Sequence, residues 1–214
     1  MEIEILAHGL ELLVALLCFI ALLPSSLNFK NLTKVYVLGS LLSFIVSKIY
    51  ILEGPSYLVR DVVAWGNFVS ISLVLSALFV IIRDSKPVFA RFPVYLTLLP
   101  MSGIIFFAII PTSYAIKDIL EFIMQAGAVL VSLLLFCVNT ILFEWKWTFV
   151  MSIFAFICAY IIPLISIENT ENELLLGAIF LCLGMILITF SLIKYPINSK
   201  KTYIVILYEL PNWG

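Results

Sequence analysis

The sequence predicts an all-α, polytopic membrane protein: a bundle of seven transmembrane helices with the N-terminus outside and the C-terminus cytoplasmic. Composition is the first reason, because 64% of the 214 residues are hydrophobic and only 12% are charged. Water-soluble domains are close to half apolar and a quarter charged, which gives them a polar surface that this chain lacks. The mean hydropathy of +1.20 leads to the same conclusion.

The second reason is the length and number of the apolar segments. A helix needs about 20 mostly apolar residues to cross a bilayer. Seven segments meet or approach this length: Ile3–Leu23, Val35–Leu52, Tyr57–Ile82, Pro93–Ile110, Tyr114–Phe143, Trp147–Ile167 and Leu174–Lys194. The chain starts with the acidic MEIEIL, whereas a signal peptide starts with basic residues, so we expect the first segment to remain as a helix. The connections are short, and residues 1–196 are therefore predicted to form one transmembrane domain.

The third reason is the distribution of Lys and Arg, which also predicts the orientation. Membrane proteins carry more positive charge on their cytoplasmic side. With the N-terminus outside, nine basic residues fall on the inner side: Lys30, Lys34, Arg83, Lys86, Arg91, Lys146, Lys194, Lys200 and Lys201. Arg60 and Lys117 fall on the outer side, and Lys48 lies near the outer end of its helix. We expect an integral, multi-pass protein with its N-terminus outside.

Prolines are expected to shape two of the segments. Pro93 stands at the start of the fourth segment, where its missing N–H costs nothing. Pro100 and Pro163 lie inside the fourth and sixth segments. Each would remove an intrahelical hydrogen bond there, so we expect each to kink its helix.

Residues 197–214 are predicted to form a short apolar tail in the cytoplasm. The run Tyr203 to Tyr208 is apolar and β-branched but far too short to span a membrane. It could lie on the inner membrane surface, with Trp213 at the interface. We favour docking of the tail, from Tyr203 to Trp213, onto a partner protein, because an exposed apolar strand otherwise promotes aggregation.

Ionisable and polar residues are concentrated near the predicted outer end of the segments. Seven residues are candidates for ligand binding or ion pairing: Glu11, Lys48, Arg60, Asp61, Trp65, Glu121 and Gln125. Charges this close to a bilayer are costly unless they are paired or wetted, which makes them functional candidates by default. If their helices are neighbours, these residues would line a polar vestibule that opens outward.

Lys48 carries the most specific prediction. It lies four residues before Leu52, or roughly 6 Å below it at 1.5 Å per residue. Its ammonium could reach back to the lipid headgroups. A polar, serine-bearing face beside it favours the opposite direction, into the bundle. We therefore expect an ion pair with Glu11, Asp61 or Glu121.

Small and polar residues recur at helical spacing and are interpreted as packing seams. Ser40, Ser43 and Ser47 share one face of the second segment, and Gly177, Gly184 and Ser191 share one face of the seventh. In the first segment His8, Glu11, Ala15 and Cys18 also share one face, which we expect to point inward.

Several function classes are disfavoured. The net charge of −1 excludes a strongly basic surface for nucleic acid. The four cysteines (Cys18, Cys137, Cys158 and Cys182) have no CxxC spacing and no histidine nearby, so we expect neither a metal nor a cofactor. His8 is the only histidine, and no nucleophile motif is present, so no catalytic residue is predicted.

Three functions remain open. The favoured one is a non-catalytic membrane protein that acts as a receptor-like module or as a subunit of a membrane complex, in contact with the bilayer and a protein partner. The second is a small secondary transporter that uses intramembrane Glu and Lys. The apolar inner half of the segments disfavours it, because a transporter exposes its site to both sides. The third is an intramembrane lipid hydrolase that uses carboxylates, for which we find no signature motif.

Overall fold

The computed structural model describes residues 2–26, 31–53, 56–85, 93–109, 114–142, 147–165 and 171–194. All regular structure in these ranges is helical. The α-helices are α1 (Glu2–Ser26), α2 (Leu32–Glu53), α3 (Ser56–Ser85), α4 (Leu99–Ile109), α5 (Tyr114–Leu142), α6 (Trp147–Ile165) and α7 (Glu171–Lys194). A short 3₁₀-helix, η2 (Val94–Leu98), precedes α4. The prediction of an all-α chain with seven helices is confirmed, whereas the predicted tail lies outside the described residues.

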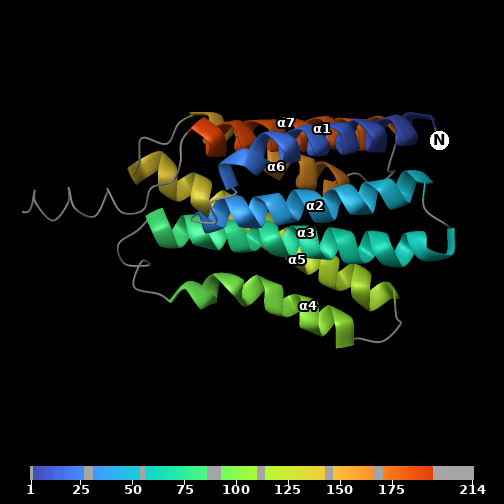
Figure 1. Ribbon diagram of the computed structural model, residues 1–214, viewed down its shortest axis with the longest axis horizontal. Helices are drawn as coiled ribbons and strands as arrows, with labels where there is room; N and C mark the ends of the chain where they lie inside the picture. The colour runs from blue at the N-terminus through green and yellow to red at the C-terminus, as the bar shows by residue number, and fades with distance from the viewer. Residues whose placement is uncertain are drawn as a thin grey trace, which may run out of the picture.

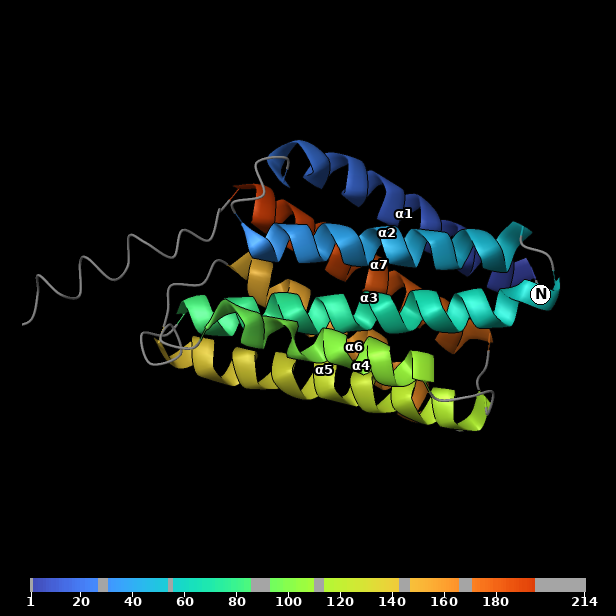
Figure 2. The same ribbon diagram turned by 60° about the horizontal axis from the view of Figure 1, so that its bottom comes forward.

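The helices run side by side along the long axis of the molecule (Figures 1 and 2). α2 packs against α1 and α3, α5 packs against α3 and α6, and α7 packs against α6 and α1. These six helices form a closed circuit of neighbours, and α4 packs against α3 at the edge of the bundle. The start of α1, the end of α2 and the starts of α3 and α5 lie at one end, on the right in Figure 1. We call this the polar end, and we call the opposite end the tail end.

Four helices are long and apolar enough to cross a membrane, judged by length and composition. They cover Ile3–Ser26, Leu32–Glu53, Val59–Arg83 and Asn172–Lys194. This indicates a multi-pass membrane protein. The apolar stretches of the other helices are shorter within the described residues: Val94–Ile109, Phe122–Leu134 and Trp147–Ile162.

The distribution of apolar side chains is that of a protein surrounded by lipid. On α1, Leu13, Leu17 and Ile20 share one face and are 59%, 60% and 62% exposed. The opposite face of the helix carries the buried Glu11 and Ala15. Large apolar groups therefore face outward, and small and polar groups are buried. In water, this arrangement would expose extensive apolar patches. The predicted inward face of the first segment is confirmed.

α3 is the central helix of the bundle. In the most apolar 18-residue stretch of α3, 61% of the residues are buried, whereas in that of α1 only 28% are buried. Toward the tail end, Ala77 and Val80 join a core with α1, α2 and α7, while Leu78 and Ile81 pack against α6. α3 therefore holds the two sides of the bundle together.

The two predicted packing seams are both present. Ser40 and Ser70 share a hydrogen bond of 2.9 Å between their hydroxyls, and Ser43 donates to the carbonyl oxygen of Gly66 at 2.9 Å, so the serine face of α2 packs on α3. On α7, the Gly184 carbonyl accepts a 3.0 Å hydrogen bond from the Ser152 hydroxyl of α6. A Cβ at Gly184 would lie 3.1 Å from the ring of Phe156 on α6, so the glycine makes room for this packing.

The prolines differ from expectation at one position. Pro100 does not kink a longer helix, because residues 94–98 form the 3₁₀-helix η2 and α4 begins at Leu99. Pro100 is thus in the first turn of α4, where backbone N–H groups have no intrahelical partner. Pro93 precedes η2 as its N-cap, in agreement with the predicted helix start. The side chain of Pro163 lies outside the described residues.

Candidate functional site

The polar end contains an ion pair between α1 and α2. The Lys48 ammonium lies 2.5 Å from a carboxylate oxygen of Glu11. The same oxygen of Glu11 lies 3.2 Å from Nδ1 of His8, one turn earlier on α1. Nδ1 of His8 also lies 3.1 Å from the Lys48 nitrogen. We call these residues, His8, Glu11 and Lys48, the inner cluster.

The inner cluster is shielded from solvent. The side chains of Glu11 and Lys48 are each only 10% exposed, and that of His8 is 17% exposed. The Lys48 ammonium also lies 5.0 Å from the centroid of the Phe44 ring, within range of a cation–π interaction. A buried charge without a counter-charge would be strongly destabilising. The Glu11 carboxylate and the Lys48 ammonium therefore each lower the cost of burying the other.

The pairing of Lys48 agrees with one of the three partners expected from the sequence. Its ammonium does not reach back to the headgroups, since it is held by Glu11. The serine face of α2 does not extend to Lys48, contrary to the prediction. Ser47 donates to Asn67 of α3 at 3.0 Å, whereas its neighbour Lys48 contacts α1. Adjacent residues point about 100° apart on a helix, so one faces each neighbouring helix.

A second pair of charges lies between α3 and α5. The Lys117 ammonium lies 3.4 Å from a carboxylate oxygen of Asp61. The Asp61 side chain is 44% exposed, and that of Lys117 is 12% exposed. This pair is therefore more accessible than the inner cluster, and water screens it more strongly.

Aromatic rings lie beneath the second pair. The Lys117 ammonium lies 5.6 Å from the ring centroid of Phe107 on α4. Phe107 meets the Trp65 ring edge to face at 4.8 Å and stacks on Phe68 at 4.4 Å. We call Asp61, Trp65, Phe107 and Lys117 the outer cluster. It ties α4 and α5 to α3 at the polar end of the bundle.

Four of the seven candidate residues fall into the two clusters. Glu11 and Lys48 belong to the inner cluster, and Asp61 and Trp65 belong to the outer cluster. Arg60 is exposed and Gln125 is partly buried. The Glu121 side chain lies outside the described residues, so its predicted role stays a prediction.

Three members of the clusters, His8, Phe107 and Lys117, were not among the candidates. Lys117 was counted from the sequence only as a basic residue of the outer side. His8 follows from its spacing, because a residue three positions before Glu11 shares its helix face. Phe107 has no comparable signal, since it stands in a uniformly apolar run and its ring partners come from another helix. Within the described residues, no group of three His, Cys, Asp or Glu side chains is placed to hold a metal ion.

No protein-family model, curated protein or solved structure matches this chain. Its chemistry must therefore be inferred from its own residues.

Proposed function

We propose that the chain is a non-catalytic integral membrane protein that acts at its polar end as a receptor-like module or as a subunit of a membrane complex. The inner cluster is the observation that supports this most directly. A catalytic carboxylate or base must reach a substrate. Here the carboxylate, ammonium and imidazole instead contact one another with little exposure, as expected of a cluster that joins two helices.

The proposed topology has seven membrane spans with the polar end outside. η2 and α4 together rise about 26 Å, taking about 2 Å per residue for five 3₁₀ residues and 1.5 Å for 11 α-helical ones. The 19 residues of α6 rise about 28 Å. Both lengths are close to the roughly 30 Å of a bilayer core. The excess of Lys and Arg in connections at the tail end supports a cytoplasmic tail end.

The outer cluster is the part of the polar end best suited to meet a ligand or partner. Asp61 offers a partly exposed carboxylate and stands four residues before Trp65 on the same face of α3. Tryptophan is among the residues that most often contribute large binding energies at protein interfaces. The tail, with its apolar run from Tyr203 to Tyr208, supplies a second contact on the opposite side of the membrane.

The subunit proposal can be tested by purifying the full chain from its native membrane in a mild detergent. We expect a stoichiometric partner that is lost when residues 197–214 are deleted. Val205→Asp should weaken its retention about as much as the deletion does, because it places a charge inside the apolar run. Thr202→Asp adds the same charge just outside that run and should retain the partner. A monodisperse protein without a partner, or equal loss from both aspartate variants, would argue against tail docking.

A secondary transporter is the second candidate function, and the inner cluster also favours it. Three titratable groups share one site within two apolar helices, as in proton-coupled transport. Reconstitution into liposomes with a pH gradient distinguishes the candidates. Gradient-driven uptake that Glu11→Gln abolishes would indicate transport, whereas no uptake agrees with the receptor or subunit proposal.

A further inference from the structure

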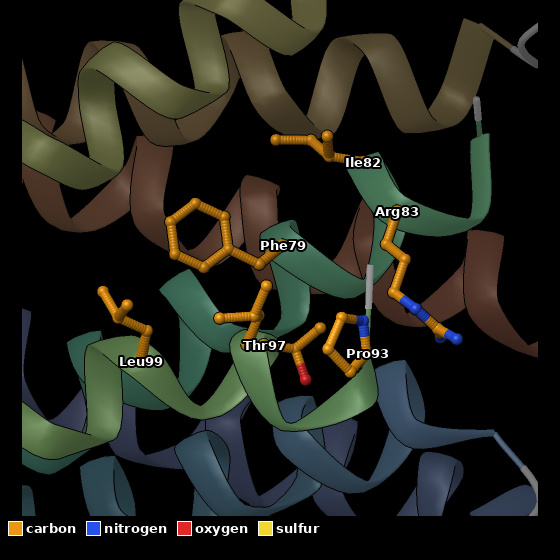
Figure 3. A pocket seen from close by; sticks show the side chains of 7 residues that line it. Phe79, Ile82, Arg83, Pro93, Thr97 and Leu99 are labelled. Carbon is orange, nitrogen blue, oxygen red and sulfur yellow. The ribbon is translucent and has the colours of Figure 1, made fainter. Parts of the chain in front are cut away.

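A cavity of about 280 Å³ lies at the tail end, between the end of α3 and the start of η2 (Figure 3). It is lined by Phe79, Ile82, Arg83, Pro93, Leu96, Thr97 and Leu99. Phe79 and Leu99 lie toward one end of it, and Arg83 lies beside Pro93 toward the other. The Thr97 hydroxyl already donates to the carbonyl of Val94 at 2.7 Å. Among the described residues, the lining of the cavity is therefore mostly apolar and carries one cation, Arg83.

The cavity lies where a membrane changes from acyl chains to headgroups. Arg83 is the last residue of the 25-residue apolar span Val59–Arg83. Such a helix rises about 37 Å, against about 30 Å for a bilayer core. Arg83 thus stands at headgroup level, and Phe79, one turn earlier, stands at the level of the acyl chains. Leu99 at the rim is 60% exposed, so the cavity opens sideways toward lipid.

The volume of the cavity and the positive charge of Arg83 together indicate which ligand fits. Pockets that enclose drug-sized ligands measure about 300–1,000 Å³, so this cavity holds part of one acyl chain and not a whole lipid. The planar guanidinium of Arg83 suits the two-pronged recognition of a phosphate. We propose that the cavity binds one acyl chain of an anionic phospholipid, with the lipid phosphate at Arg83. This site does not depend on the orientation of the chain, nor on any partner at its polar end.

Binding can be measured by native mass spectrometry of the full chain in a nonionic detergent. The probes are phosphatidylglycerol, phosphatidylcholine with the same acyl chains, and glycerol phosphate. We expect phosphatidylglycerol to bind at least about fivefold more tightly than phosphatidylcholine, because a basic residue near the surface favours anionic lipid. Glycerol phosphate lacks the acyl chain and should not bind in the same concentration range. Equal affinity for both lipids, or equally tight binding of glycerol phosphate, would overturn the proposal.

Variants with matched controls separate the two parts of the site. Arg83→Gln should abolish the preference for phosphatidylglycerol, and Arg83→Lys should keep part of it. Lys194→Gln is the control, because Lys194 is basic and ends α7 at the same end of the bundle without lining the cavity. Leu99→Trp should fill the cavity and weaken both lipids severalfold. Leu98→Trp, on a neighbouring residue outside the lining, should weaken neither.

Two results among these variants would contradict the site. One is loss of the lipid preference in Lys194→Gln to the same extent as in Arg83→Gln, which would reduce the effect to general surface charge. The other is unchanged lipid binding in Leu99→Trp, which would place the acyl chain elsewhere. Retained helical circular dichroism of Arg83→Lys checks that the position tolerates substitution.

Discussion

Replacing Lys48 with methionine is expected to destabilise the protein by about 3 kcal/mol. Methionine leaves the Glu11 carboxylate, which is only 10% exposed, without its cation. Breaking a buried ion pair on one side typically costs about 3–5 kcal/mol. The lower end of this range applies because His8 still lies 3.2 Å from the carboxylate. The free energy of unfolding can be measured in mixed micelles with increasing dodecyl sulfate, following helix content by circular dichroism.

The double variant and a matched control identify the cause. Lys48→Met combined with Glu11→Gln should recover much of the loss, because no charge then remains unpaired. Asp61→Asn breaks an ion pair whose carboxylate is 44% exposed, and it should cost less than about 1 kcal/mol. If the double variant were as unstable as the sum of the two single variants, the ion pair would not be what holds these side chains in place.

Gly66→Ala is expected to cost up to about 2 kcal/mol, although alanine favours helices. A Cβ at this position would lie 2.8 Å from the Cβ of Ser47 and 3.2 Å from the carbonyl oxygen of Ser43. Neither atom is the end of a flexible chain, so α2 and α3 must move apart. Such overpacking costs about 1–3 kcal/mol, and the roughly 1 kcal/mol by which alanine is favoured over glycine in a helix offsets part of this cost.

The control for Gly66 is Gly127 on α5. A Cβ at Gly127 has no neighbouring atom within 4 Å. Gly127→Ala should therefore be neutral or stabilising by up to about 1 kcal/mol. The same unfolding measurement compares the two variants. Equal stability of Gly66→Ala and Gly127→Ala would show that the close contact between α2 and α3 does not limit side-chain size at position 66.

Composition and periodicity predict the fold class but not the order of helices around the bundle. The length of apolar runs indicates helices, and small residues at helical spacing identify the contacting faces. Which helix each face contacts depends on long-range packing, which cannot be predicted from a single sequence. The placement of α4 at the edge and of α3 at the centre came only from the structure.

The contacts of single side chains in the two clusters could also be predicted only in part. The cost of a buried charge predicts that Lys48 has a carboxylate partner, but three candidates satisfied that requirement equally well. The choice of Glu11 depends on α1 and α2 being neighbours and on the direction of one side chain. Phe107 lay beyond prediction, because nothing local distinguishes a ring that stacks on Phe68 from one that faces lipid.

We propose that the charged end of the bundle faces the outside of the membrane. Cysteine labelling in intact cells with a membrane-impermeant maleimide tests it most directly, using Asn169→Cys and Ser199→Cys. The parent chain gives the background, since its four cysteines fall within apolar segments of the sequence. We predict that Asn169→Cys is labelled from outside and that Ser199→Cys is labelled only after the membrane is permeabilised. Labelling of Ser199→Cys from outside in intact cells would show that the C-terminal tail lies outside and would rule out this orientation.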